Sequence, residues 1–262
     1  MADVSQHRDC DSRPRGFCHR FAWAYDLIVD RPGGPDVAAV GDAFMRAGLE
    51  RGAVLVDAGC GTGTYACGLA AGGFEVIAVD RSAALGAEAQ ARARGDRLDV
   101  EFVCADFTAG WAPGRGVDGA LCRGVLNDLL SDDERKRAFE AFGSWLRPGG
   151  MLLVDVRDRA SSAQRYSGGR RLERTVRRGD DALVLVSTTT MDPGSDLLLV
   201  VEHWAGTVDG VAVDEQNRFV MRCWTWEELQ ELSRATGFRR VASLAADVLG
   251  ARDDRLVALA HR

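Results

Sequence analysis

The feature that most constrains the fold is an apolar run that passes directly into a glycine-rich turn, Val54-Leu55-Val56-Asp57-Ala58-Gly59-Cys60-Gly61-Thr62-Gly63. A short apolar run followed by helical spacing is typical of a buried strand that leads into a helix. Glycines allow the backbone to approach a ligand closely, and exposed amides at the start of a helix favour a negative group. The segment therefore predicts a ligand-binding turn at the carboxyl end of a strand.

Strand-like and helical segments alternate along the chain after this turn. The β-rich runs fall at 54–57, 75–80, 99–104, 117–122 and 151–156, and the helical patterns between them fall at 65–71, 82–94 and 132–146. Ser131 is a candidate N-cap for the last of these helices. Such alternation is the signature of a parallel sheet covered on both faces. With final strands near 238–244 and 254–260, we expect an α/β fold with a doubly wound, mostly parallel seven-stranded sheet.

Extended segments replace this alternation after residue 156. They fall at 170–178, 182–191, 196–206 and 214–222, and are separated by Gly, Asp and Pro turns. This pattern predicts a small antiparallel β insertion after the fifth strand. Helical spacing returns at 225–236, where Thr225 and Glu228 form a capping-box signature and Gly237 is the expected stop.

The predicted organisation has four parts. Residues 1–50 should form an N-terminal helical lid, with helices at 21–29 and 36–49 joined by a turn at 32–35. Residues 51–160 should form the ligand-binding core, 161–224 the insertion that covers the substrate site, and 225–262 a helix and the last two strands of the core sheet. A length of 262 residues fits one large domain carrying such an inserted part.

Composition and charge exclude several classes of protein. Hydrophobic residues make up 46% of the chain and charged residues 27%, as in ordinary globular proteins. A net charge of −6 repels polyanions and gives no support to nucleic-acid binding. The first 20 residues lack the apolar core of a secretory signal, and no run approaches the ~18 apolar residues that span a bilayer. Seven cysteines without a CxxC pair fit a reducing compartment, so we expect a cytoplasmic protein with no membrane partner.

A run of arginines between Arg165 and Arg178 departs from the acidic balance. Guanidinium groups bind phosphates and carboxylates well, so this stretch could meet such a group on a substrate or a partner. A solvated charged face is the favoured interpretation.

A second acid strengthens the ligand-binding interpretation. Asp80 ends the strand at 75–80, where a ribose would lie beside the carboxyl edge of the sheet. A dinucleotide site also places an acid there, so this feature alone is compatible with NAD and with S-adenosylmethionine (SAM). The loop separates the two, because Gly59, Gly61 and Gly63 alternate instead of following G-x-G-x-x-G. Asp57 is unfavourable beside a pyrophosphate and suits a cationic ligand such as SAM.

Four ordered motifs between residues 54 and 156 resemble those of the class I SAM-dependent methyltransferases. They are the 57–63 loop, Asp80, Ala105-Asp106-Phe107, and Leu146-Arg147-Pro148-Gly149-Gly150. The resemblance implies a Rossmann-like fold and SAM as the cofactor, with S-adenosylhomocysteine (SAH) as its product. It also implies methyl transfer to a small-molecule acceptor.

The resemblance also implies contacts for each part of the cofactor. Gly59 and Gly61 would line the methionine portion, Asp57 would lie near its cationic groups, and Asp80 would bind the ribose. The adenine end would be held by an acid and two flanking side chains, Asp106, Arg81 and Phe107. The remaining expected contacts are Arg123, which would face the cofactor or the lid, and Tyr25, which resembles a lid tyrosine near the cofactor. Buried aromatic packing is the alternative for Tyr25.

Acceptor contacts are expected from the lid, from the loop after the fourth strand and from the insertion. Tyr25 and Asn127 are candidates, and Asp128 could either orient the acceptor or cap the following helix. His203 is the best-placed histidine for proton removal, although a structural histidine is the favoured interpretation. Cys60 is expected to pack in the loop rather than act as a nucleophile.

The reaction itself is less constrained by the sequence. Nitrogen, oxygen and carbon acceptors all stay open, and no carboxylate set with metal-ligand spacing is evident, so no metal is expected. A non-methyl reaction on the same fold, such as a cyclisation, and a non-catalytic SAM-binding protein are the alternatives.

Overall fold

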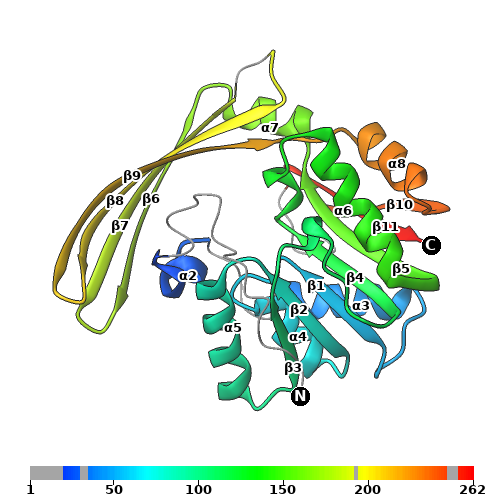
Figure 1. The fold of residues 1–262 in the computed structure, drawn as a ribbon. Helices are drawn as coiled ribbons and strands as arrows, with labels where there is room; N and C mark the ends of the chain where they lie inside the picture. Colours follow the sequence, from blue (N-terminus) through cyan, green and yellow to red (C-terminus); the bar gives the residue numbers. More distant parts are fainter. Residues whose placement is uncertain (1–19, 30–34, 192–193, 247–252) are drawn as a thin grey trace.

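The computed structural model describes residues 20–29, 35–191, 194–246 and 253–262. Seven strands form the core sheet in the order β10-β11-β5-β4-β1-β2-β3 (Figure 1). Pairing is parallel from β3 to β5, and β11 runs antiparallel to both β5 and β10. The predicted doubly wound, mostly parallel seven-stranded sheet is therefore confirmed. The strands are β1 (Val54–Ala58), β2 (Glu75–Asp80), β3 (Val100–Cys104), β4 (Val117–Arg123), β5 (Leu146–Arg157), β10 (Arg240–Leu244) and β11 (Arg255–His261).

Helices cover both faces of this sheet, and β1 shows why. All five of its residues are buried, so its alternate side chains enter two different apolar clusters. Leu55 packs with Phe44 and Leu69, whereas Val56 packs with Phe139. A strand buried on both faces reads as a continuous apolar run, as the sequence does here. The covering helices are α3 (Pro35–Arg46), α4 (Thr64–Ala71), α5 (Ala83–Asp96), α6 (Asp132–Trp145) and α8 (Trp226–Ala235).

Two capping boxes fix the starts of α6 and α8. The Ser131 hydroxyl accepts from the Glu134 N–H at 3.2 Å while the Glu134 carboxylate accepts from the Ser131 N–H. Thr225 and Glu228 repeat this arrangement. The sequence predicted the full box at Thr225 and Glu228, and at α6 it predicted Ser131 as the N-cap without the contribution of Glu134.

A second, antiparallel sheet follows β5 and arches away from the core (Figure 1). Its strands are β6 (Arg170–Arg178), β7 (Asp181–Met191), β8 (Leu197–Val208) and β9 (Val211–Arg222). Asp209 and Gly210 both have positive φ and form the two-residue turn between β8 and β9, as hairpins of this twist require. The predicted insertion is present with nearly the predicted strand limits.

Two short helical segments join this sheet to the rest of the chain. At its outer half, η1 (Ala22–Ala24) and α2 (Tyr25–Val29) lie under the arch and pack Phe21, Ala24 and Ile28 against Trp204. At its inner end, α7 (Arg159–Tyr166) packs Tyr166 against Met191 and Leu198. The sequence did not predict α7, whose polar composition leaves only the N-cap Asp158 as a signal.

The limits of the predicted four-part organisation stay predictions. Residues 1–19 and 30–34 of the expected lid, most of the turn at 32–35 included, lie outside the described residues. Among the helices that the structure describes, none combines the length and apolar content needed to cross a membrane.

We expect Ser131→Ala to lower the free energy of unfolding by about 1 kcal/mol, because it removes the acceptor for the Glu134 amide at the start of α6. Urea denaturation followed by circular dichroism measures this change. The matched control is Ser144→Ala on the same helix, where the exposed hydroxyl only donates to the Ala141 carbonyl. Equal stability of both variants would contradict the role of the cap.

Candidate active site

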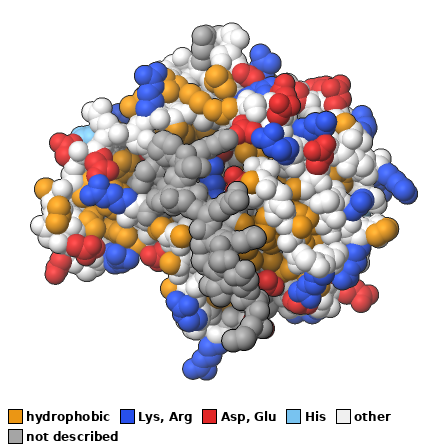
Figure 2. Space-filling view, in the orientation of Figure 1, with side chains coloured by type: hydrophobic (Ala, Val, Ile, Leu, Met, Phe, Trp, Pro, Cys, Tyr) orange, Lys and Arg blue, Asp and Glu red, His pale blue; other side chains and the backbone are white. Residues whose placement is uncertain are grey.

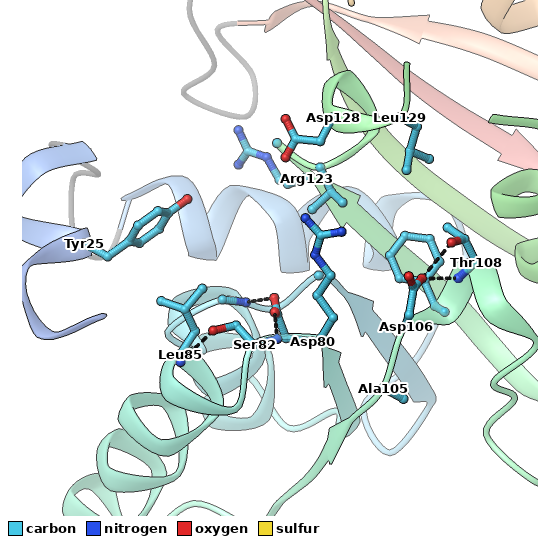
Figure 3. Close-up of a pocket in the computed structure, with 16 residues that line it drawn as sticks. Tyr25, Asp80, Ser82, Leu85, Ala105, Asp106, Thr108, Arg123, Asp128 and Leu129 are labelled. Atoms are coloured by element: carbon cyan, nitrogen blue, oxygen red, sulfur yellow. Dashed lines mark hydrogen bonds between the residues drawn. The ribbon is translucent and has the colours of Figure 1, made fainter. Parts of the chain in front are cut away.

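A pocket lies at the carboxyl edge of the core sheet, where β1, β2, β3 and β4 end. Figure 3 shows Tyr25 on one side, Asp106 on the opposite side, and Asp80 between them, with Asp128 across the pocket from Asp80. Ligands of open α/β sheets bind at this edge. The lining residues are Tyr25, Gly59, Gly61, Asp80, Arg81, Ser82, Leu85, Ala105, Asp106, Phe107, Thr108, Arg123, Gly124, Val125, Asp128 and Leu129.

The two glycines at the pocket floor, Gly59 and Gly61, exclude a side chain for different structural reasons. Both have positive φ, +75° at Gly59 and +56° at Gly61. A Cβ on Gly59 would lie 2.3 Å from the Val125 side chain, so close packing excludes one. A Cβ on Gly61 would point into open space, with no described atom within 4 Å. The backbone at Gly61 is therefore a cradle into which a ligand fits and which a side chain would fill.

The Asp80 carboxylate is already oriented by the backbone. Its Oδ2 accepts from the Gly61 N–H and its Oδ1 from the Ser82 N–H, each at 2.8 Å. These two bonds hold the carboxylate at the pocket floor (Figure 3). Each carboxylate oxygen can accept a further bond, so a pair of vicinal hydroxyls would find both acceptors preoriented.

The opposite end of the pocket is an aromatic wall with one acid. Asp106 Oδ1 accepts from the N–H and the hydroxyl of Thr108, at 2.8 and 2.7 Å, and both bonds are visible in Figure 3. Phe107 packs on Phe142 at a centroid distance of 5.5 Å and on Trp145 at 6.2 Å. Phe107 thus belongs to the core and also lines the pocket, a rigid surface on which a flat ring can lie.

Arg123 contributes a fixed cation to the pocket. Its guanidinium donates to the Tyr65 hydroxyl at 2.6 Å, and its carbon lies 4.6 Å from the centre of the Tyr65 ring. On the other side Asp155 lies 3.5 Å away and also accepts from the Gly124 N–H at 2.7 Å. Only 9% of the Arg123 side chain is exposed. A carboxylate is the group that such a cation binds best.

The structure does not place Asp57 in the pocket wall. Only 3% of this residue is exposed, and it alternates with Val56 so that it lies on the α3 and α4 side of β1, beneath the loop. Asp57 therefore lies behind the loop, and its expected contact with the cofactor stays a prediction. Burial, together with the charges of Asp57 and Asp80, raises the pKa of the Cys60 thiol well above 9. Cys60 thus stays protonated at neutral pH and packs in the loop.

Asn127 is not in the pocket either. Its side chain is 1% exposed, and its Nδ2 donates to the Arg222 carbonyl at 2.9 Å. Its Oδ1 accepts from the Arg157 N–H and from the Arg255 guanidinium, each at 3.2 Å. Asn127 thus connects three strands, β5, β9 and β11, and its expected contact with the acceptor stays a prediction. Sequence alone cannot separate these roles, because both need a polar side chain in this loop.

His203 lies on the wrong face of the second sheet for proton removal in the pocket. Its neighbour Trp204 packs inward, in the same buried cluster as Phe21 and Ile28. Side chains alternate along a strand, so His203 points outward. There it contacts Asp214 on β9 at 2.6 Å. This arrangement favours a structural pair for His203, and its role as a base stays a prediction.

Of the residues expected near the acceptor, Tyr25 on α2 and Asp128 in the loop after β4 do line the pocket. Asp128 does not cap α6, since Ser131 occupies that position. Next to it, Leu129 lines the pocket and its carbonyl accepts from Arg135, which also donates to the Arg222 and Cys223 carbonyls. Burial and the Arg222 cation lower the pKa of Arg135 to about 10, so it stays charged at neutral pH. The pocket loop is thus tied to the end of β9.

At least three of the six arginines in the run contact other side chains of the molecule. Arg165 pairs with Asp253, Arg171 with Glu173, and Arg178 lies over the Trp23 ring. Figure 2 shows basic and acidic side chains interspersed over one face of the molecule, without a large basic patch. These contacts agree with the favoured interpretation of a charged, solvated surface.

Two positioning residues were not predicted from the sequence. Asp155 holds Arg123 and Gly124, and its signal was an acid inside the apolar run Leu152-Leu153-Val154-Asp155-Val156. Asp26 contacts the glycine loop from the lid, and adjacency to Tyr25 was its only signal. The described residues contain no group of three or more His, Cys, Asp or Glu side chains that could hold a metal ion.

Comparison with known proteins relates part of the chain to methyltransferases. Residues 55–150 match the family model described as a methyltransferase domain. The chain is 30% identical over 161 residues to a glycine/sarcosine N-methyltransferase of Halorhodospira halochloris, which covers 60% of this chain and 59% of that one. It is 28% identical over 209 residues to a cypemycin N-terminal methyltransferase of Streptomyces, with 80% of each chain covered. It spans between 51% and 59% of the length of four of the curated relatives that it matches.

Solved structures share the fold over most of the chain. A sugar N-methyltransferase from Streptoalloteichus superposes with a TM-score of 0.75 at 20% identity, covering 91% of this chain and 92% of the other. A SAM-dependent methyltransferase from Clostridium acetobutylicum gives 0.73 at 17% identity, covering 92% and 97%. At these identities the likeness concerns the fold, including the second sheet.

Residues 55–150 thus match a methyltransferase domain, and the fold is that of solved SAM-dependent methyltransferases, as the sequence motifs predicted. The N-terminal helices, the second sheet and the last two strands lie outside the matched segment.

Asn127→Leu should lower the free energy of unfolding by about 1–3 kcal/mol, because it leaves the Arg222 carbonyl and the Arg157 amide without their buried partner. Thermal and urea denaturation measure the loss. Gln90→Leu, on the surface of α5, is a control for the change of side-chain type. An unchanged midpoint with lost activity would restore Asn127 as an acceptor contact.

Proposed function

We propose that this chain is a SAM-dependent methyltransferase that methylates an amine of a small polar molecule. The observation that carries the proposal is the convergence of the Gly61 cradle, the preoriented Asp80 and the fixed Arg123 on one pocket. SAM presents a carboxylate, a ribose with two hydroxyls and an adenine, and each finds a matching group at this edge of the sheet. When bound, SAM supplies a methyl group already activated by its sulfonium, so orientation and exclusion of water remain as the tasks of the protein.

The residues divide these tasks by position. Asp80 accepts hydrogen bonds from the ribose hydroxyls, and Arg123 pairs with the carboxylate. Arg81, Asp106 and Phe107 line the adenine end. The Gly59–Gly61 backbone supports the methionine portion, because both residues line the pocket floor.

The acceptor end lies between Tyr25 and Asp128. Both side chains line the pocket from segments more than 100 positions apart, which the fold brings together. A carboxylate there suits an amine, since it binds the ammonium form and can accept the proton that must leave before or during attack. The relatives named glycine/sarcosine, cypemycin N-terminal and sugar N-methyltransferases support a nitrogen acceptor. Methylation of oxygen is the competing outcome, which an acceptor panel distinguishes.

The proposal predicts micromolar binding of SAM and SAH, which isothermal titration calorimetry measures. Asp80→Ala should weaken both by about 1–3 kcal/mol, since hydrogen bonds to a charged acceptor are lost. Asp42→Asn, an exposed acid on α3, should bind as the parent does. Absence of binding by the parent would refute the function, and parent-like binding by Asp80→Ala would remove this residue from the site.

Asp128→Asn should lower kcat/KM for an amine acceptor about 10–100-fold, the loss of a hydrogen bond to a charged group, while the Kd of SAM changes by less than about threefold. A panel of small amines and hydroxyl compounds, with methylated products identified by mass spectrometry, provides the acceptor. Asp133→Asn, on the exposed first turn of α6, is the matched control. Methylation confined to hydroxyl compounds would overturn the amine assignment.

A further inference from the structure

The lid helix is held to the cofactor loop by a closed ring of polar contacts. The Thr62 hydroxyl donates to Asp26 Oδ1 at 2.6 Å, and the Thr64 hydroxyl lies 3.5 Å from Asp26 Oδ2. Arg92 on α5 completes the ring, because its guanidinium pairs with the Asp26 carboxylate and its Nε donates to the Thr62 carbonyl at 3.1 Å. Three residues from two separate segments, Thr62, Thr64 and Arg92, thus contact the one carboxylate of Asp26.

The ring joins two parts of the pocket wall that the chain itself does not connect. Asp26 directly follows Tyr25, which lines the pocket from the lid. Thr62 directly follows Gly61, which lines the pocket from the loop and donates to Asp80. A movement of α2 away from the pocket would therefore withdraw Tyr25 and at the same time remove the partner of Thr62.

The other side of the same short helix is held by the second sheet. Phe21 lies 6.3 Å from the Trp204 ring, and Ala24 and Ile28 belong to the same buried cluster. One face of the lid is therefore apolar and attached to β6–β9, whereas the other is polar and attached to the glycine loop. The two attachments differ in strength, because the Asp26 side chain is 26% exposed and the Arg92 side chain 38%, so water competes for this pair.

We propose that Asp26 is a positioning residue that couples lid closure to occupation of the cofactor pocket. This inference rests on the proposed function, since it concerns the same pocket. When the ring is closed, Tyr25 covers the pocket and the 61–63 backbone is fixed. When it opens, the lid and the loop are released together, which lets the product leave. A ligand that needs the fixed loop then favours the closed lid, and the closed lid favours the ligand to the same extent.

The coupling is tested by titrating SAH into the parent, Asp26→Asn, Arg92→Gln and the double variant. Each single variant should raise the Kd of SAH about tenfold, within the range usual for coupling between sites, and mainly through faster dissociation. The double variant should be no weaker than either single one, since both break the same ring. Arg94→Gln is the control, because Arg94 is exposed two positions further along α5. Kd values that match the parent, or that multiply in the double variant, would overturn the proposal.

Hydrogen exchange separates coupling from a general loss of structure. In the parent, saturating SAH should slow amide exchange across residues 21–29, whereas in Asp26→Asn the protection should stay at the ligand-free level although the pocket is filled. Thermal midpoints without ligand should be equal in all variants, which shows that the core is intact. Equal ligand-induced protection in parent and variant would refute the role of Asp26. Failure of the parent to bind SAH would instead refute the proposed function.

Discussion

The hydrogen bonds from Gly61 and Ser82 to Asp80 are the contacts on which the rest of the site depends. They join the turn after β1 to the turn after β2, so the two loops form one surface rather than two. Parallel pairing of β1 with β2 brings these turns to the same edge, and the positive φ at Gly61 points its amide at the carboxylate. Every other pocket residue is placed relative to this floor.

Buried polar groups then connect the floor to distant parts of the chain. Asp155 holds Arg123 and Gly124, Asn127 joins β5, β9 and β11, and Arg135 ties Leu129 to the end of β9. Such groups are costly to bury unless each finds a partner, so their positions are tightly specified once the partners are in place. Hydrogen bonds as well as apolar packing therefore hold the wall of the pocket in place.

Features that depend on local chemistry were largely predictable from the sequence. The glycine loop and the capping residues Ser131 and Thr225 were identified because each signal lies within a few positions of the chain, whereas Asp80 came from its place at the end of the second strand and Asp106 from the family resemblance. Features that depend on tertiary arrangement were not identified. The outward direction of His203 depends on the register of β8, and the burial of Asn127 depends on strands more than 25 positions away. The short polar helix α7 was not predicted from the sequence, because packing at Tyr166 stabilises it and it has no apolar stripe.

The second sheet leaves and rejoins the core at a single place. Arg157 and Arg159 exchange backbone hydrogen bonds with Trp224, at 2.8 Å in each case, so the first and last residues around the insertion lie side by side. A chain segment whose ends meet in this way can be lengthened, shortened or replaced without changing the register of β5. The second sheet can therefore diverge in evolution as a separate module while the pocket floor at the edge of the core sheet is kept.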